Sequence, residues 1–188
     1  MIDITNDLLL QEDIMTAYAI DLLHSSINFS IKHMMITKVN GAFESFSAQI
    51  EAEQIETFKN SAIRFELDVA SVNTRDVSRD QHLISADFFD ADRYPKIIFV
   101  KQAVESDGEK FKLLGDLTIK DITKPVVFDV TYLGHVKSPW NTDAYGFSCS
   151  TLINRKDFNL TYNAVLEKGG LLLDEIVQIN VELQLNPM

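Results

Sequence analysis

The sequence predicts an all-β fold of antiparallel strands, arranged as a sandwich or as a closed barrel. Apolar and polar residues alternate with a period of two over several segments, which is the pattern of strands with one buried face. Many short strands with few crossover helices are typical of these two architectures. The chain has 188 residues, which suits one domain with a sizeable core.

The predicted strands follow one another along most of the chain. The clearest alternation lies in five segments, 27–31, 63–69, 111–119, 126–130 and 177–185. Weaker candidates are 18–21, 41–52, 96–104 and 145–153. Asn40-Gly41 and Ser106-Asp107-Gly108 have the composition of hairpin turns between strands. We therefore expect eight or nine strands.

Two stretches break the alternation and are predicted as short helices. The first is 52–61, and the second is 78–88, where Ser78 suits an N-cap. No internal repeat, low-complexity tract or linker divides the sequence. We expect an N-terminal extension over residues 1–16 and a single domain over residues 17–188.

Charge and composition exclude several classes of partner. The formal net charge of −11 repels nucleic-acid phosphates and disfavours lasting attachment to an anionic membrane. No segment approaches the roughly 18 apolar residues that cross a bilayer, so permanent membrane insertion is not expected. The acidic N-terminus lacks the basic start and apolar run of a secretory signal, which predicts a cytoplasmic protein unless a leader was removed.

The residues that commonly carry catalysis or metal binding do not form a known pattern. Cys149 is the one cysteine, so an intrachain disulfide and a zinc cluster of cysteines are excluded, and a small buried hydrophobe is expected. The sequence has no Gly-rich phosphate loop, no Gly-x-Ser-x-Gly elbow and no His-Glu-x-x-His motif. We expect no cofactor, no metal and no enzymatic activity.

The twelve phenylalanines can either fill a core or line a cavity. An eight-stranded barrel has an interior just wide enough for side chains or for one small ligand. Aromatic side chains on inward faces would form broad apolar walls with few rotatable bonds. The residues alone favour a filled core, because most alternating phenylalanines simply pack together.

An ordered series of motifs resembles the YceI-like family of lipid-binding proteins, from about Tyr18 to Leu185. The most specific motifs are Ala70-Ser71-Val72-Asn73-Thr74, Arg79-Asp80-Gln81-His82-Leu83, Asp87-Phe88-Phe89-Asp90, Tyr94-Pro95 and Asn154-Arg155-Lys156-Asp157-Phe158. The resemblance implies an extended, lipocalin-like, eight-stranded antiparallel barrel with one or two short helices. It also implies a non-catalytic carrier of a long-chain isoprenoid or similar lipid, and a homodimer, since family members are often dimeric.

Three positions depart from the family pattern. The family usually has Trp where Tyr18 stands, and Gly where Asn159 and Asp121 stand. Asn and Asp tolerate left-handed backbone angles better than most residues, so both turns are expected to survive. None of the three changes removes the apolar walls.

The candidate ligand-binding residues combine inward-facing apolar side chains with polar residues of the second predicted helix and its surroundings. They are Phe29, Ile31, His33, Phe43, Phe65, Leu67, Arg79, His82, Phe88, Phe89, Phe99, Leu117, Phe128 and Phe147. The cavity role of these residues is what the resemblance implies.

Several of these residues have a second interpretation. His33 is either a pocket residue or a satisfied core histidine. Arg79 either binds a phosphate head group or pairs with Asp80 or Asp76 to anchor its loop. Phe88-Phe89 is either a plug of the core or a lid over the ligand. Outside the candidate set, Arg155 and Asp157 are expected to form a buried pair near a turn.

Two other functions compete with the lipid carrier. An enzyme that acts on a small hydrophobic substrate would use His33 or His82 as a base, and that base would need a carboxylate or water partner in the pocket. A structural protein would have a filled core. A cavity inside the barrel would distinguish the carrier from the structural protein.

Overall fold

Strands make up most of this protein, whose computed structural model describes residues 14–107, 110–164 and 172–188. Residues 1–13, most of the predicted N-terminal extension, lie outside the described residues. The strand segments are β1 (Thr16–Ile20), β2 (Ser26–His33), β3 (Thr37–Phe43), β4 (Phe46–Ala52), β5 (Ala62–Asp68), β6 (Val72–Asn73), β7 (Lys96–Asp107), β8 (Lys110–Ile119), β9 (Ile122–Lys137), β10 (Asp143–Asn154) and β11 (Leu173–Pro187). One α-helix, α1 (Val77–Ile84), and two 3-10 turns, η1 (Val69–Ser71) and η2 (Arg155–Phe158), complete the described elements.

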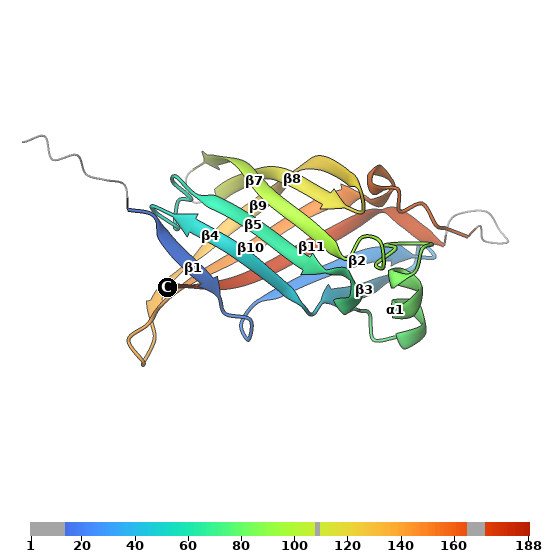
Figure 1. Ribbon diagram of the computed structural model, residues 1–188, viewed down its shortest axis with the longest axis horizontal. Helices are drawn as coiled ribbons and strands as arrows, with labels where there is room; N and C mark the ends of the chain where they lie inside the picture. The colour runs from blue at the N-terminus through green and yellow to red at the C-terminus, as the bar shows by residue number, and fades with distance from the viewer. Residues whose placement is uncertain (1–13, 108–109, 165–171) are drawn as a thin grey trace, which may run out of the picture.

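These segments form a closed, eight-stranded antiparallel barrel, because three of its strands are each broken in two. β1 and β2 both pair with β11 and form one interrupted strand. β4 pairs with β1 and β3 pairs with β2, so these two form the second interrupted strand. β5 and β6, which η1 separates, pair with β4 and β3 and form the third. β5 pairs with β7, each strand from β7 to β10 pairs with the one that follows it, and β11 pairs with β1 and β2. Figure 1 shows the elongated barrel with α1 at one end. The predicted fold class is confirmed.

The predicted inward faces are those that form the core. On β8, Phe111, Leu113, Leu117 and Ile119 are buried. On β11, Val181, Leu183 and Leu185 are buried, and the polar residues between them face outward. The period-two alternation therefore identified the interior of the barrel correctly.

The predicted hairpin at Asn40-Gly41 is wrong, since both residues lie inside β3. The turn before β3 is at 34–36, where Met34 and Met35 have φ angles of 51° and 61°. Gly41 lies opposite Phe29 of β2. Because Gly41 has no side chain, it leaves room for packing across the sheet, and it is not part of a turn.

The predicted helix over 52–61 is also wrong. This segment contains turns and an isolated bridge between Gln54 and Lys59, and Phe58 and Asn60 have φ angles of 56° and 46°. The second helix is confirmed, but it begins at Val77 and ends at Ile84. Its N-cap is Asp76 and not Ser78, because the Asp76 carboxylate accepts from the backbone N–H of Arg79 at 3.1 Å.

The two turns that depart from the family pattern behave differently. Asn159 follows η2 with φ 56° and ψ 29°, so its left-handed conformation is confirmed. Asp121 is not the left-handed residue of its turn; Lys120 is, with φ 58°. A two-residue turn with positive φ at its first position is typical of type II′ hairpins. Within the described residues, no helix is long and apolar enough to cross a membrane.

Candidate functional site: an apolar cavity inside the barrel

A cavity of about 360 Å³ lies inside the barrel. Its wall is built almost entirely from aliphatic and aromatic side chains of the inward faces. The volume falls in the range of pockets that enclose a single small ligand. A barrel with this cavity does not have the filled core that the residues alone favoured.

All fourteen predicted site residues lie on the wall of this cavity. They are Phe29, Ile31, His33, Phe43, Phe65, Leu67, Arg79, His82, Phe88, Phe89, Phe99, Leu117, Phe128 and Phe147. They come from strands all around the barrel, from α1 and from the segment after it. That they contact a ligand stays a prediction.

Two glycines keep large rings close to the wall. A Cβ on Gly41 would lie 2.4 Å from Cζ of Phe29, and a Cβ on Gly115 would lie 2.4 Å from Cζ of Phe99. Each ring thus occupies the space above a glycine on a neighbouring strand. Since any other residue would displace the ring, the two glycines help to keep the interior open.

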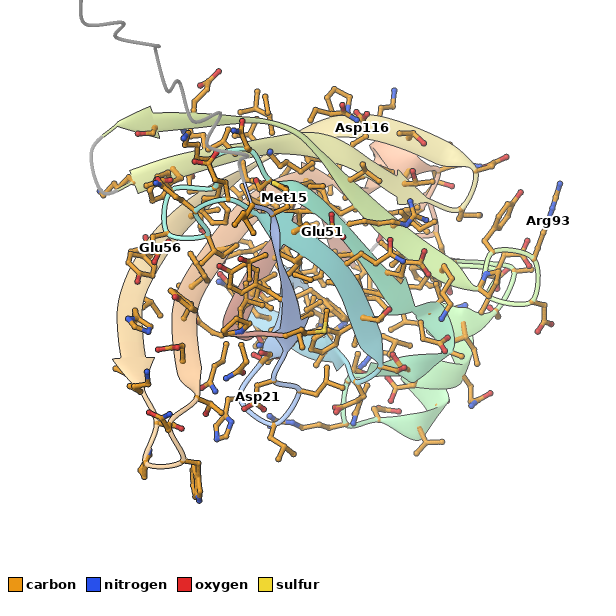
Figure 2. All side chains as sticks on the ribbon, turned by 60° about the vertical axis from the view of Figure 1, so that its left-hand side comes forward. Met15, Asp21, Glu51, Glu56, Arg93 and Asp116 are labelled. Atoms are coloured by element: carbon orange, nitrogen blue, oxygen red, sulfur yellow. The ribbon has the colours of Figure 1, made fainter. Side chains whose placement is uncertain are left out.

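The segment 52–61 closes one end of the cavity, which we call the closed end. Ile55 has no exposed surface, and Phe58 is buried against the rings of Phe111 and Phe147, at centroid distances of 5.4 and 5.2 Å. Glu56, labelled in Figure 2, belongs to the same segment. At this end burial, and secondarily the nearby charge of Tyr145, raises the pKa of Tyr18.

The opposite end carries α1 and the segment 155–162, and we call it the helix end (Figure 1). Three rings join the two parts: His82 lies 5.0 Å from Phe88 and 4.7 Å from Tyr162, and Phe88 lies 5.0 Å from Tyr162, between centroids. Phe89 contacts Phe43 at 6.0 Å. The pair Phe88-Phe89 therefore lies across this end of the cavity, where it can act as plug or lid.

Arg79 anchors the loop before α1, as one of its two interpretations predicted, but its partner is Thr74. Nε donates to the Thr74 hydroxyl at 2.7 Å, and Nη2 donates to the Thr74 carbonyl at 2.9 Å. The Asp80 carboxylate accepts from the same hydroxyl at 2.5 Å and from the Thr74 backbone N–H at 2.9 Å. Arg79 and Asp80 thus both form hydrogen bonds with Thr74, and they are linked through it instead of by a direct ion pair.

The ionisable groups of the cavity offer little acid–base chemistry. His82 is within 3.2 Å of the Asp87 carboxylate, but 65% of the Asp87 side chain is exposed and it is not part of the cavity wall. Burial, and secondarily the charge of Glu182, raises the pKa of the Cys149 thiol to about 12, so the thiolate is absent at neutral pH. The described residues contain no group of three His, Cys, Asp or Glu that could hold a metal.

Arg155 lies on the cavity wall, although the sequence did not indicate it as a site residue. The predicted pair with Asp157 is wrong, because the Arg155 guanidinium bonds to backbone carbonyls of Asp174, Leu160 and Tyr162. Such partners leave no side-chain signal in a sequence. Ile55 and Phe58 were also missed, because the segment 52–61 was predicted to be a short helix and not a cap on the barrel.

Comparisons with known proteins agree with this architecture. The family model described as YceI-like domain matches residues 18–185. The chain belongs to the YceI-like family. A UPF0312 protein of Staphylococcus aureus strain MSSA476 is 38% identical over 165 residues, which cover 87% of this chain and 94% of that relative.

Several solved structures have the same fold as this chain. BcnA of Burkholderia cenocepacia has a TM-score of 0.75 and 27% identity, and the match covers 88% of this chain and 98% of BcnA. The YceI protein of Campylobacter jejuni has a TM-score of 0.71 and 33% identity, with 83% and 89% covered. A domain from Saccharophagus degradans has a TM-score of 0.65 at 16% identity, with 92% and 99% covered, and shares the fold. Family and cavity together support an apolar-ligand binding protein.

Proposed function

We propose that this protein binds a long apolar lipid, a polyisoprenoid or an isoprenoid quinone, inside its barrel, and stores or transports it. The apolar cavity carries this proposal: its wall includes Phe58 at the closed end and Tyr162 at the helix end. The Saccharophagus degradans structure, which shares the fold, is described as a polyisoprenoid binding domain. This description adds support for the ligand class.

The energetics favour an extended hydrocarbon. Burying each CH₂ group contributes about 0.8 kcal/mol of transfer free energy, so a long chain supplies a large gross driving force. Loss of chain and side-chain freedom on binding offsets much of it. A long chain therefore binds well only where the wall is apolar and already formed, as it is here.

The first experiment identifies the ligand. The purified full-length chain is extracted with organic solvent and the extract is analysed by mass spectrometry. We expect a long-chain lipid at near-stoichiometric amounts. On the delipidated protein, a neutral fluorescent lipid should be displaced by a polyprenol and poorly by a short-chain acid. Equal displacement by the short acid would indicate a small, shallow site and contradict the proposal.

A pair of glycine variants tests whether the cavity is the binding site. Gly41→Ala forces the Phe29 ring toward the cavity, whereas Gly146→Ala places its Cβ no closer than 3.4 Å to Leu133. We expect Gly41→Ala to weaken polyprenol binding about tenfold, since overpacking costs about 1–3 kcal/mol. Gly146→Ala should bind like the wild type. Equal binding by all three proteins would place the ligand elsewhere.

The absence of a buried acid–base pair at the cavity argues for a carrier in preference to an enzyme, within the described residues. The homodimer and the cytoplasmic location stay predictions. Light scattering on the purified chain tests the first, and fractionation of cells that express the chain tests the second.

A further inference from the structure

Arg155 is a buried cation on the wall of an otherwise apolar cavity. Only 3% of its surface is exposed, and it lies at the helix end together with Leu160 and Tyr162, which also line the cavity. η2 places Arg155 just after β10. A charge this deep in an apolar interior requires compensation from its surroundings.

The hydrogen bonds of Arg155 leave one part of the guanidinium without a partner. Nε donates to the carbonyl of Asp174 at 2.8 Å, and Nη1 donates to the carbonyls of Leu160 and Tyr162, the latter at 2.9 Å. These bonds use all three hydrogens of the two nitrogens. Nη2 carries two more hydrogens, and it is buried with no partner in the described part of the chain.

The charge of Arg155 is not neutralised by an ion pair either. The Glu175 carboxylate accepts from Lys156 Nζ at 2.5 Å and from Asn154 at 3.5 Å. The Asp174 carboxylate accepts from the backbone N–H groups of Glu175 and Ile176. Both acids are thus occupied by other donors, and no ion pair within 4.0 Å involves Arg155 among the described residues.

We propose that Nη2 of Arg155 binds an anionic head group of the lipid, a phosphate or a carboxylate, while the hydrocarbon tail extends toward Phe58. This inference rests on the proposed function, and it adds the charge of the ligand and its direction in the barrel. An anion would supply the acceptor that Nη2 lacks and a countercharge in direct contact with the guanidinium, which Glu175 and Asp174 affect only from beyond ion-pair distance. A neutral alcohol supplies a weaker acceptor and no charge.

Two other polar residues of the wall, Arg79 and His82, are less suited to this role. Arg79, the residue for which the sequence suggested a phosphate contact, already donates Nε and Nη2 to Thr74. His82 lies against the Asp87 carboxylate, which would repel an anion. Arg155 is the wall residue whose buried donor is unpaired in the described structure.

The test compares three ligands with one hydrocarbon chain and different heads: geranylgeranyl phosphate, geranylgeranoic acid and geranylgeraniol. Each displaces a neutral fluorescent lipid from the delipidated full-length chain. A hydrogen bond between charged groups predicts that one of the two anions, or both, binds about tenfold to a hundredfold tighter than the alcohol. Which anion binds better distinguishes a phosphate head from a carboxylate head.

Variants assign the preference to a residue. Arg155→Gln should bind the alcohol as well as the wild type does and lose the preference for the anions. Lys156→Gln is the matched control, because Lys156 is the adjacent cation and its charge is paired with Glu175 at the surface. It should keep the wild-type preference. Persistence of the preference in a folded Arg155→Gln protein would overturn the inference.

Wild-type measurements decide the matter where Arg155→Gln does not fold. A crystal structure of the wild type with the preferred anion should place its head group within hydrogen-bond distance of Arg155 Nη2. A head group at Arg79 or outside the helix end would overturn the inference. Equal binding of anions and alcohol by the wild type would also overturn it and leave the carrier function standing. Failure to bind any of the three ligands would count against the carrier function itself.

Discussion

The closed end and the helix end terminate the same barrel in opposite ways. At the closed end the chain folds Ile55 and Phe58 into the barrel, and both are buried among aromatic rings. At the helix end the rings of His82 and Tyr162 meet, yet Tyr162 is 40% exposed and the surrounding contacts are hydrogen bonds to backbone. Apolar packing closes one end. At the other end Phe88 and Phe158 are buried too, but polar contacts and partly exposed rings surround them.

This difference indicates where a ligand enters. Segments with few buried apolar contacts open locally at lower free energy than the packed core does. The helix end combines half-exposed rings with the donor of Arg155, so it can both open and hold a polar head. The closed end has neither property, and we expect it to stay shut during exchange.

The largest expected effect comes from removing a ring at the closed end. Phe147→Ala should lower the free energy of unfolding by about 3–5 kcal/mol, because Phe147 is 1% exposed and packs against Phe58 and Tyr132. Tyr162→Ala, at the helix end, should cost about 1 kcal/mol and speed ligand release. Urea unfolding and ligand dissociation measure the two quantities. Equal stability losses would contradict the contrast between the ends.

A smaller effect is expected where α1 is fastened to the barrel. Thr74→Val keeps the side-chain shape but removes the hydroxyl that Arg79 and Asp80 share, which should cost about 1–3 kcal/mol. Because the helix end is held by these bonds, ligand dissociation should become several-fold faster.

A second threonine provides the control for this change. The Thr118 hydroxyl bonds to Thr123 on the exposed side of the β8–β9 hairpin, so Thr118→Val should alter neither stability nor dissociation appreciably. If Thr74→Val lowered stability and left the dissociation rate unchanged, α1 would not control ligand exchange.

The sequence predicted the wall of the cavity but not its two ends, and the reason is physical. Alternation in strands is local, so neighbouring residues were enough to assign Phe65, Phe99 and Phe128 to the inward faces of their strands. Gly41 was misassigned because its role is to receive the Phe29 ring from another strand. Phe58 was missed because its left-handed backbone, and not a helix, turns its ring into the barrel.

Arg155 shows the same limit in the site itself. Its carbonyl partners lie 5, 7 and 19 residues away in the chain, and backbone acceptors have no residue type to recognise. The motif Asn154-Arg155-Lys156-Asp157-Phe158 suggested an ion pair with Asp157 instead. That the interior is hollow followed from the family resemblance, since the residues alone favoured a filled core.

The smallest expected effect lies between the two ends, where β1 is joined to β2 and Asp21 is labelled in Figure 2. The Asp21 carboxylate accepts from the backbone N–H of Leu23, from His24 Nδ1 at 2.8 Å and from Gln184 Nε2 at 3.0 Å. The bond from His24 is the main cause that lowers the pKa of Asp21. Asp21→Asn should therefore cost less than about 1 kcal/mol at pH 7, because the pair with His24 is exposed and screened.

The pH dependence of this effect has a definite sign. A carboxyl whose pKa is lower in the folded state stabilises the protein above its unfolded pKa of about 3.9, and this contribution is lost as the pH falls through the folded pKa. Wild type and Asp21→Asn should thus differ at pH 7, and the difference should begin to shrink near pH 4 and disappear as the pH falls through the lowered pKa of folded Asp21. Thermal unfolding from pH 7 to pH 3 measures the difference, with Asp129→Asn as an exposed control that pairs with Lys112. A difference that stayed constant over this range would show that the Asp21 charge contributes nothing and that only the shape of its side chain matters.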